Sequence, residues 1–155
     1  MEFTVRNARL TDIDAAVRVL ARADHWSGAG RDDADRLRSL LYVPAATVLV
    51  AEQAHRVVGV GVLSIRPSVR SGPFVGCIDE LGATAGDDGW TGNDARDASL
   101  RTEIGRSVIE QLVASARNKG CSRVEVTDPL VSAEAPLLSA AGFAGQGTLL
   151  SRAIG

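Results

Sequence analysis

The segment from Gly76 to Gly120 constrains the fold most strongly, because it joins a strand, an irregular loop and a long helix. GCIDELGA (residues 76–83) has the pattern of a buried strand, and it carries two adjacent carboxylates, Asp79 and Glu80. A loop follows, and the helix SLRTEIGRSVIEQLVASARNKG ends at Gly120. A turn from a strand into a helix N-terminus leaves backbone N–H groups unpaired, and such turns often bind phosphate. We therefore expect a site for a phosphorylated ligand in this segment.

The length and composition favour one globular domain that spans residues 1–155. A chain of 155 residues can bury about two thirds of its unfolded surface. Hydrophobic residues make up 45% and charged residues 23%, which is ordinary for such a domain. The net charge of −2 gives no clustered basic surface for general nucleic-acid binding, so we expect no nucleic-acid partner.

The sequence shows no signal peptide and no apolar run of membrane-spanning length. We therefore expect a cytoplasmic protein without a membrane partner, in a compartment that keeps thiols reduced. Under those conditions Cys77 and Cys121 are expected to be small buried hydrophobic side chains, in preference to a disulfide or a catalytic thiol.

Hydrophobic periodicity predicts an α/β fold with a mixed, mostly antiparallel central sheet flanked by helices. Gly59 and Gly61 fall inside one predicted strand, which indicates a bend or a close approach by a neighbouring element. Thr11 is the expected N-cap of the first helix, with Asp14 in a variant capping box. The expected strands are residues 3–9, 47–52, 57–65, 76–83, 122–127 and 148–154, and the expected helices begin at 11 and cover 32–42, 99–120 and 133–141.

Several short segments resemble one known family in their order along the chain. They are VRNARLTDI (residues 5–13), VLVAE followed by VVGV (48–52 and 57–60), IDEL (78–81) and AGF (141–143). Over nearly its whole length the chain resembles the GCN5-related N-acetyltransferase family. The resemblance implies an acyl-CoA N-acyltransferase-like fold, with acetyl-CoA as the cofactor. It also implies acetyl transfer to an amine of a small-molecule or protein acceptor.

The resemblance places the cofactor motif at LRTEIG, residues 100–105. The family's pyrophosphate loop reads Gln/Arg-x-x-Gly-x-Gly/Ala, and only the final glycine is kept here. A glutamate replaces the middle glycine, which adds a side chain and a like charge near a phosphate. Arg101 and the following Arg106 suit phosphate oxygens, although a solvated helix face is an equally good reading. The implied cofactor-binding residues are Leu81, Ala83, Arg101, Thr102, Glu103, Ile104, Gly105 and Arg106.

Glu80 is the candidate catalytic base, because only a neutral amine is nucleophilic and a carboxylate must first remove its proton. Partial burial on a central strand would raise the pKa of Glu80 towards a useful range. Strict strand alternation predicts that Asp79 and Glu80 face opposite sides, so at most one enters the cleft. The resemblance implies that His25 and Trp26 line the acceptor site, and it puts Leu138 where the family often has a tyrosine acid. Asp79 is a candidate to bind a positive charge of the acceptor.

Three interpretations stay open from the sequence. The first is an acetyl-CoA-dependent N-acetyltransferase, and the second is a degenerate member that kept the fold and acts as a ligand-binding or interaction module. The third is an unrelated α/β enzyme with another phosphorylated ligand at the same turn. We expect no metal, because the spacing of the loop aspartates matches no ligand pattern. A homodimer through an exposed edge strand is compatible with the sequence.

Overall fold

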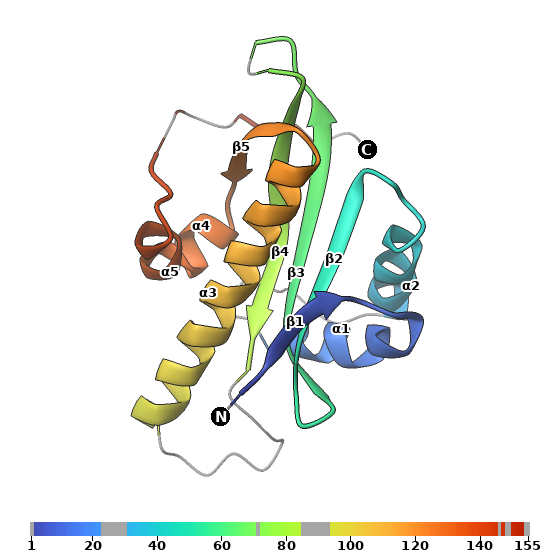
Figure 1. Ribbon diagram of the computed structural model, residues 1–155, viewed down its shortest axis with the longest axis vertical. Helices are drawn as coiled ribbons and strands as arrows, with labels where there is room; N and C mark the ends of the chain where they lie inside the picture. Colours follow the sequence, from blue (N-terminus) through green and yellow to red (C-terminus); the bar gives the residue numbers. More distant parts are fainter. Residues whose placement is uncertain are drawn as a thin grey trace.

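A five-stranded sheet forms the centre of the computed structural model, and helices lie on both of its faces (Figure 1). The structure describes residues 2–22, 31–70, 72–84, 94–145, 147 and 150–153. Its strands are β1 (Thr4–Asn7), β2 (Ala46–Gln53), β3 (Arg56–Pro67), β4 (Phe74–Ala83) and β5 (Cys121–Val126). Its helices are the 3-10 helix η1 (Leu10–Asp12), α1 (Ile13–Ala21), α2 (Arg31–Leu40), α3 (Asp94–Asn118), α4 (Leu130–Ala133) and α5 (Ala135–Ala140).

The strands lie in chain order, β1-β2-β3-β4-β5. Each of the first four is antiparallel to its neighbour, whereas β5 is parallel to β4 after the crossover through α3. This arrangement confirms the predicted mixed, mostly antiparallel sheet. β1 and β5 are therefore its two outer strands.

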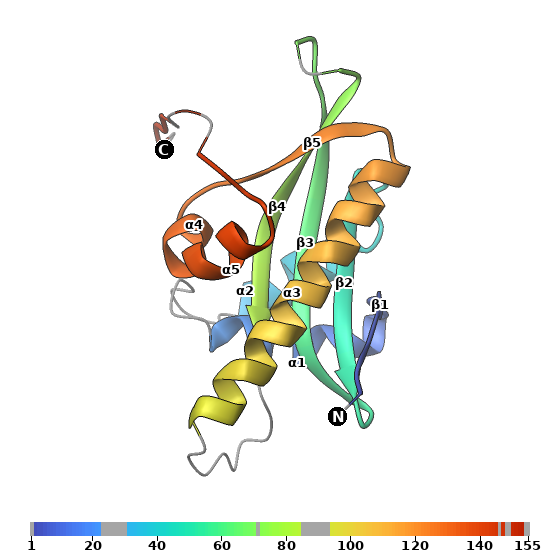
Figure 2. The ribbon, with the colours of Figure 1, turned by 60° about the vertical axis from the view of Figure 1, so that its left-hand side comes forward.

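Two apolar clusters fill the space between the sheet and the helices on either side of it. The cluster under α3 also includes residues of α4, α5 and the α3-facing side of the sheet, and the cluster on the opposite face joins α1 and α2 to β2 and β3. Figure 2 shows α3 crossing one face of the sheet, with α1 and α2 behind it. In the part of the chain that the structure describes, no helix is both long and apolar enough to cross a membrane.

Gly59 and Gly61 of β3 lie directly beneath α3. A Cβ atom on Gly59 would come within 2.7 Å of Ile104, and one on Gly61 within 2.5 Å of Val108. Real Cβ atoms do not approach other atoms so closely, so larger residues would push the helix away from the sheet. The close approach predicted from these two glycines is confirmed.

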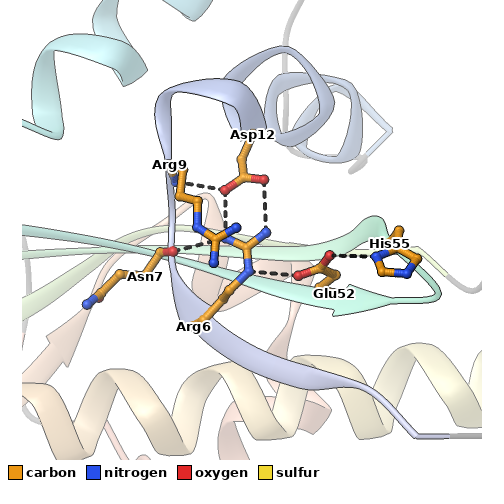
Figure 3. Close-up of polar contacts among 6 residues, drawn as sticks. All are labelled: Arg6, Asn7, Arg9, Asp12, Glu52 and His55. Atoms are coloured by element: carbon orange, nitrogen blue, oxygen red, sulfur yellow. Dashed lines mark hydrogen bonds and ion pairs between the residues drawn. The ribbon is translucent and has the colours of Figure 1, made fainter.

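The start of the chain is fixed to the sheet by the ion-pair network in Figure 3. Arg6 of β1 donates two hydrogen bonds to the buried Asp12 carboxylate, at 2.7 and 3.0 Å, and one to Glu52 of β2 at 2.7 Å. The backbone N–H of Arg9 also donates to Asp12, at 2.7 Å. The helical start is therefore capped through Asp12 of η1, and the predicted capping pair of Thr11 and Asp14 is wrong.

The C-terminal elements differ from the prediction in two ways. The expected helix over residues 133–141 is two short helices, α4 and α5, and Pro136 lies in the first turn of α5, where a missing N–H is tolerated. The expected strand over 148–154 is absent from residues 150–153, which belong to no strand. The other residues of that prediction, apart from these four, lie outside the described part of the chain.

Candidate active site

A β-bulge interrupts β4 at the two carboxylates. Ile78 pairs with Leu63 of β3, and Glu80 pairs with Val62, the residue directly before Leu63. Asp79 is therefore an extra residue with no partner in the register. A bulge of this kind breaks the strict alternation of side chains along a strand.

Glu80 faces α1 and α2. Leu81, the next residue, belongs to the apolar cluster under α3. Gly82 faces the other way, because a Cβ atom built on it would lie 3.3 Å from Leu20 of α1. Since successive strand residues alternate, Glu80 shares the face of Gly82.

Asp79 lies on that same face. A Cβ atom on Gly76 would contact Leu63 and Ala116 under α3, so its neighbour Cys77 faces the opposite side. The Asp79 carboxylate lies close enough to the Cys77 thiol to raise its pKa, which places this carboxylate on the same side as well. The prediction that the two carboxylates face opposite sides is therefore wrong, and the bulge is the physical reason.

The surroundings of Glu80 favour its neutral form. Burial is the main cause, because it removes water from the charged carboxylate, and the negative charges of Asp79 and of Asp33 on α2 act in the same direction. Together they raise the pKa of Glu80 from 4.5 to about 7. A carboxylate with this pKa is a mixture of both forms near neutral pH, which suits a general base. Sequence reasoning did not identify Asp33, and the acidic first turn of α2 was the only signal for it.

β4 continues beyond the end of its parallel neighbour. The last residue of β5, Val126, pairs with Ile78, so residues 79–83 of β4 extend past β5. Figures 1 and 2 both show the short β5 beside only the first part of β4. Within the described residues no strand pairs with 79–83 on this side. We call this stretch the free edge of β4.

Two residues direct their backbone groups to the free edge. The N–H of Thr84 donates to the carbonyl of Val58 in β3, at 2.8 Å. Because successive residues of a strand send their N–H and C=O groups to opposite edges, those of Leu81 and Ala83 point away from β3. A ligand with amide groups can bind there as an added strand would. This geometry fits the roles predicted for both residues.

The predicted cofactor motif lies inside a helix. α3 begins at Asp94, so the helix start predicted at residue 99 is wrong, and residues 100–105 lie more than one turn from its N-terminus. Within a helix each backbone N–H bonds to the carbonyl four residues earlier. The Thr102 hydroxyl also donates to the carbonyl of Ala98, at 2.9 Å. The described structure therefore has no pyrophosphate turn at residues 100–105.

The side chains of this stretch point in several directions. Arg101, Thr102 and Glu103 are exposed, whereas Ile104 is fully buried in the core. Gly105 is covered by α5, because a Cβ atom on it would lie 2.8 Å from the Leu137 side chain. Close helix packing thus explains the retained glycine without a ligand.

Arg106 points away from the free edge of β4. It lines a groove between α3 and the first strand, together with Phe3, Val5 and Glu110. That strand is at the opposite border of the sheet from β5. The free edge therefore fits an amide-bearing arm, whereas the residues predicted to hold a pyrophosphate do not gather around one place.

The remaining predicted residues divide into three groups. His25 and Trp26 lie outside the described residues. Leu138 is buried in the core under α3 and offers no acid there. Cys77 and Cys121 are free, and burial raises the pKa of the Cys77 thiol to about 11, which argues against a nucleophile. The described part of the chain holds no cluster of three or more His, Cys, Asp or Glu that could bind a metal.

The fold matches those of solved acetyltransferases along the whole chain. Glucosamine-6-phosphate N-acetyltransferase from Arabidopsis thaliana matches with a TM-score of 0.72 and 15% identity, over 100% of both chains. An aminoglycoside N-acetyltransferase in complex with CoA matches with a TM-score of 0.75 and 14% identity, over 99% of this chain and 95% of the other. An aminoglycoside 6'-N-acetyltransferase from Acinetobacter haemolyticus matches with a TM-score of 0.72 and 16% identity, over 98% of both chains. No protein-family model and no curated protein matches the sequence significantly.

Proposed function

We propose that this protein, which has the fold of the GCN5-related N-acetyltransferases, transfers acetyl from acetyl-CoA to an amine. The observation that carries the proposal is Glu80, a half-buried carboxylate whose pKa is raised to about 7. It belongs to the free edge of β4, where the neighbouring Leu81 and Ala83 can bind an amide-bearing donor. The candidate base and the candidate donor site are thus one residue apart.

Glu80 prepares the acceptor. At neutral pH an aliphatic amine is mostly an ammonium ion, which has no lone pair for attack. Glu80 takes that proton, directly or through one water molecule, and the neutral nitrogen forms a bond to the acetyl carbon. The donor supplies this carbon as a thioester, whose carbon–sulfur bond breaks with the electron pair left on sulfur.

The sulfur leaves without a dedicated acid. Leu138, at the position where the family often has a tyrosine, has no proton to donate. A thiol has a pKa of about 8.5, so a thiolate is a stable leaving group. The attacking nitrogen loses its second proton as the amide forms, and this proton reaches the thiolate through water. The arrangement therefore does not depend on the missing tyrosine.

The acceptor is a cationic small molecule or a protein amine. Two of the matching structures are aminoglycoside N-acetyltransferases, and aminoglycosides carry several amino groups. In this chain the carboxylate of Asp79 lies on the same face as Glu80 and can hold a second positive charge. His25 and Trp26 are proposed to line the acceptor site, and the protein is proposed to act in the cytoplasm.

The test is acetylation of a panel of small amines and lysine peptides, read by mass spectrometry with acetyl-CoA as donor. Glu80→Gln is expected to lower kcat/KM about a hundredfold or more, because it removes the general base. Glu110→Gln, at an exposed carboxylate on α3, is the matched control and should change kcat/KM less than twofold. Equal activity of Glu80→Gln and the wild type would contradict the role of Glu80.

A non-catalytic binding module is the second candidate. The helical state of residues 100–105 favours it, because the predicted pyrophosphate turn is not formed. This alternative would be supported if no amine of the panel is acetylated and CoA nevertheless raises the Tm in a thermal unfolding assay. Acetylation that depends on Glu80 would exclude it.

A further inference from the structure

We infer that the described residues of this site do not fit the pyrophosphate of a nucleotide, so that pantetheine thioesters without a nucleotide serve as donors alongside acetyl-CoA. The inference rests on the proposed function and deepens it. It follows from the contrast between the open edge of β4 and the closed, fully helical state of residues 100–105.

The free edge can bind a pantetheine arm by itself. Leu81 and Ala83 each direct one N–H and one C=O to that edge, and the two residues lie about 6.6 Å apart along the strand. A pantetheine arm contains two amide groups in an extended chain, so it can pair with them as an edge strand would. None of these hydrogen bonds involves a phosphate or an adenine.

The turn that would hold a pyrophosphate is fixed as helix by packing. The Ile104 side chain is fully buried and lies over Gly59, where even a Cβ atom would come within 2.7 Å of it. One residue later, Gly105 is covered by Leu137 of α5. Unwinding this turn to free its N–H groups would pull Ile104 out of the core and break both contacts.

The charges of this stretch do not favour a pyrophosphate either. Glu103 carries an exposed negative charge at the position of the family's middle glycine. Arg106 lies over the groove beside β1, across the sheet from the free edge. Arg101 is a single exposed cation two residues from Glu103, and solvent screens such a charge strongly.

The test compares acetyl-CoA with acetyl-pantetheine as donors to the same amine. We expect kcat/KM values within tenfold of each other, and no competition by adenosine 3',5'-bisphosphate at millimolar concentration. A loss of a hundredfold or more with acetyl-pantetheine, or inhibition by micromolar bisphosphate, would overturn the inference. That result would show that a part of the chain other than residues 100–105 binds the nucleotide.

Two variants separate the contacts of the arm from those of the nucleotide. Arg101→Gln should leave the ratio of kcat/KM with acetyl-CoA to kcat/KM with acetyl-pantetheine unchanged. A lower ratio in this variant would show that Arg101 contacts a phosphate of acetyl-CoA. Ala83→Pro removes an N–H from the free edge and should lower kcat/KM equally for both donors. Its folded state is checked by circular dichroism, and if Ala83→Pro does not fold, the donor comparison and Arg101→Gln decide alone.

Failure of the proposed function has a different signature. If neither donor is turned over, acetyl transfer fails, and calorimetric binding of CoA and pantetheine then decides the inference. Dissociation constants within tenfold of each other would support recognition through the arm. A hundredfold tighter complex with CoA, or no binding of either compound, would overturn it.

Discussion

The carboxyl groups of Asp79 and Glu80 lie on the same face of the sheet, because Asp79 is the extra residue of a bulge in β4. The negative charge of Asp79 is one of the causes that raise the pKa of Glu80. Asp79→Asn removes this charge, so the ionised form of Glu80 becomes more favourable and its pKa falls below about 7. The acid limb of the pH profile of kcat/KM should move to lower pH.

The control for this prediction is Asp14→Asn, which removes an exposed carboxylate from α1. It should leave the acid limb in place. The pKa of Glu80 can be measured independently by carbon-13 NMR of its side-chain carboxyl group. An unchanged NMR titration in Asp79→Asn would show that the two carboxylates do not interact.

Glu80 should lower the stability of the protein at high pH. Its pKa is about 7 in the folded state and 4.5 in its ordinary state, so the folded protein holds this proton more tightly. The ionisation penalty is absent below pH 4.5, develops as the pH rises, and is complete above about pH 7. The full shift corresponds to about 3 kcal/mol, and partial solvent access reduces the expected penalty to about 1–2 kcal/mol.

Glu80→Gln is therefore expected to stabilise the protein at pH 8, and by less as the pH falls towards 5. Urea denaturation at several pH values measures the difference in the free energy of unfolding. A constant difference across this range would show that the pKa of Glu80 is not raised in the folded state.

The contact between β3 and α3 makes a prediction about packing. Gly61→Ala would place a Cβ atom 2.5 Å from Val108 and 2.7 Å from Leu112, both fully buried. Overpacking of this kind costs about 1–3 kcal/mol. Gly145→Ala is the matched control, because a Cβ atom there would meet nothing within 4 Å. Thermal unfolding should show a lower Tm for Gly61→Ala alone, and equal Tm values would contradict the close approach.

The sequence predicted the sheet and its main helices because their apolar residues recur with clear periods. The strand pairs of β2, β3 and β4 and the close packing on Gly59 and Gly61 were readable from these local patterns. The prediction of Glu80 as a half-buried carboxylate was also confirmed, since a charged residue in an apolar strand is conspicuous. These features show in the local residue pattern, although the contacts of Gly59 and Gly61 join distant parts of the chain.

The errors arise where the deciding contacts are distant in the sequence. The bulge at Asp79 depends on how β4 pairs with β3, and no residue pattern in β4 alone announces it. The helical state of residues 100–105 depends on Ile104 packing on β3 and on Leu137 covering Gly105. A comparison with a family motif cannot detect such packing, because it reads only the residues of the motif.

The pairing of Arg6 with Asp12 makes a prediction about acid stability. The Arg6 guanidinium holds the pKa of Asp12 below its ordinary value, so this pair stabilises the fold above the ordinary pKa of an aspartate and is lost as the pH falls further. Asp12→Asn leaves the part-buried guanidinium paired with Glu52 alone and should destabilise the protein by about 1–2 kcal/mol at pH 7.

The check is urea denaturation at pH 7 and at pH 3, with Asp14→Asn as the control at an exposed site. The difference between Asp12→Asn and the wild type should shrink at pH 3, below the ordinary pKa of an aspartate. Equal losses for the two variants at pH 7 would show that the network in Figure 3 adds little to stability.

The turn between β2 and β3 predicts a stabilising substitution. Ala54 and His55 connect the paired residues Gln53 and Arg56, with φ values of 49° and 64°. Two-residue hairpins of this type need positive φ at both positions and favour Asn-Gly, because glycine adopts this conformation without steric cost. His55→Gly should therefore raise the free energy of unfolding by about 0.5–1 kcal/mol.

The fully exposed His55 lies 3.9 Å from Glu52, and such an exposed pair contributes little. His55→Ala keeps a Cβ atom in the left-handed region, so it should give no gain; an equal gain in both variants would point to removal of the imidazole and not to the backbone.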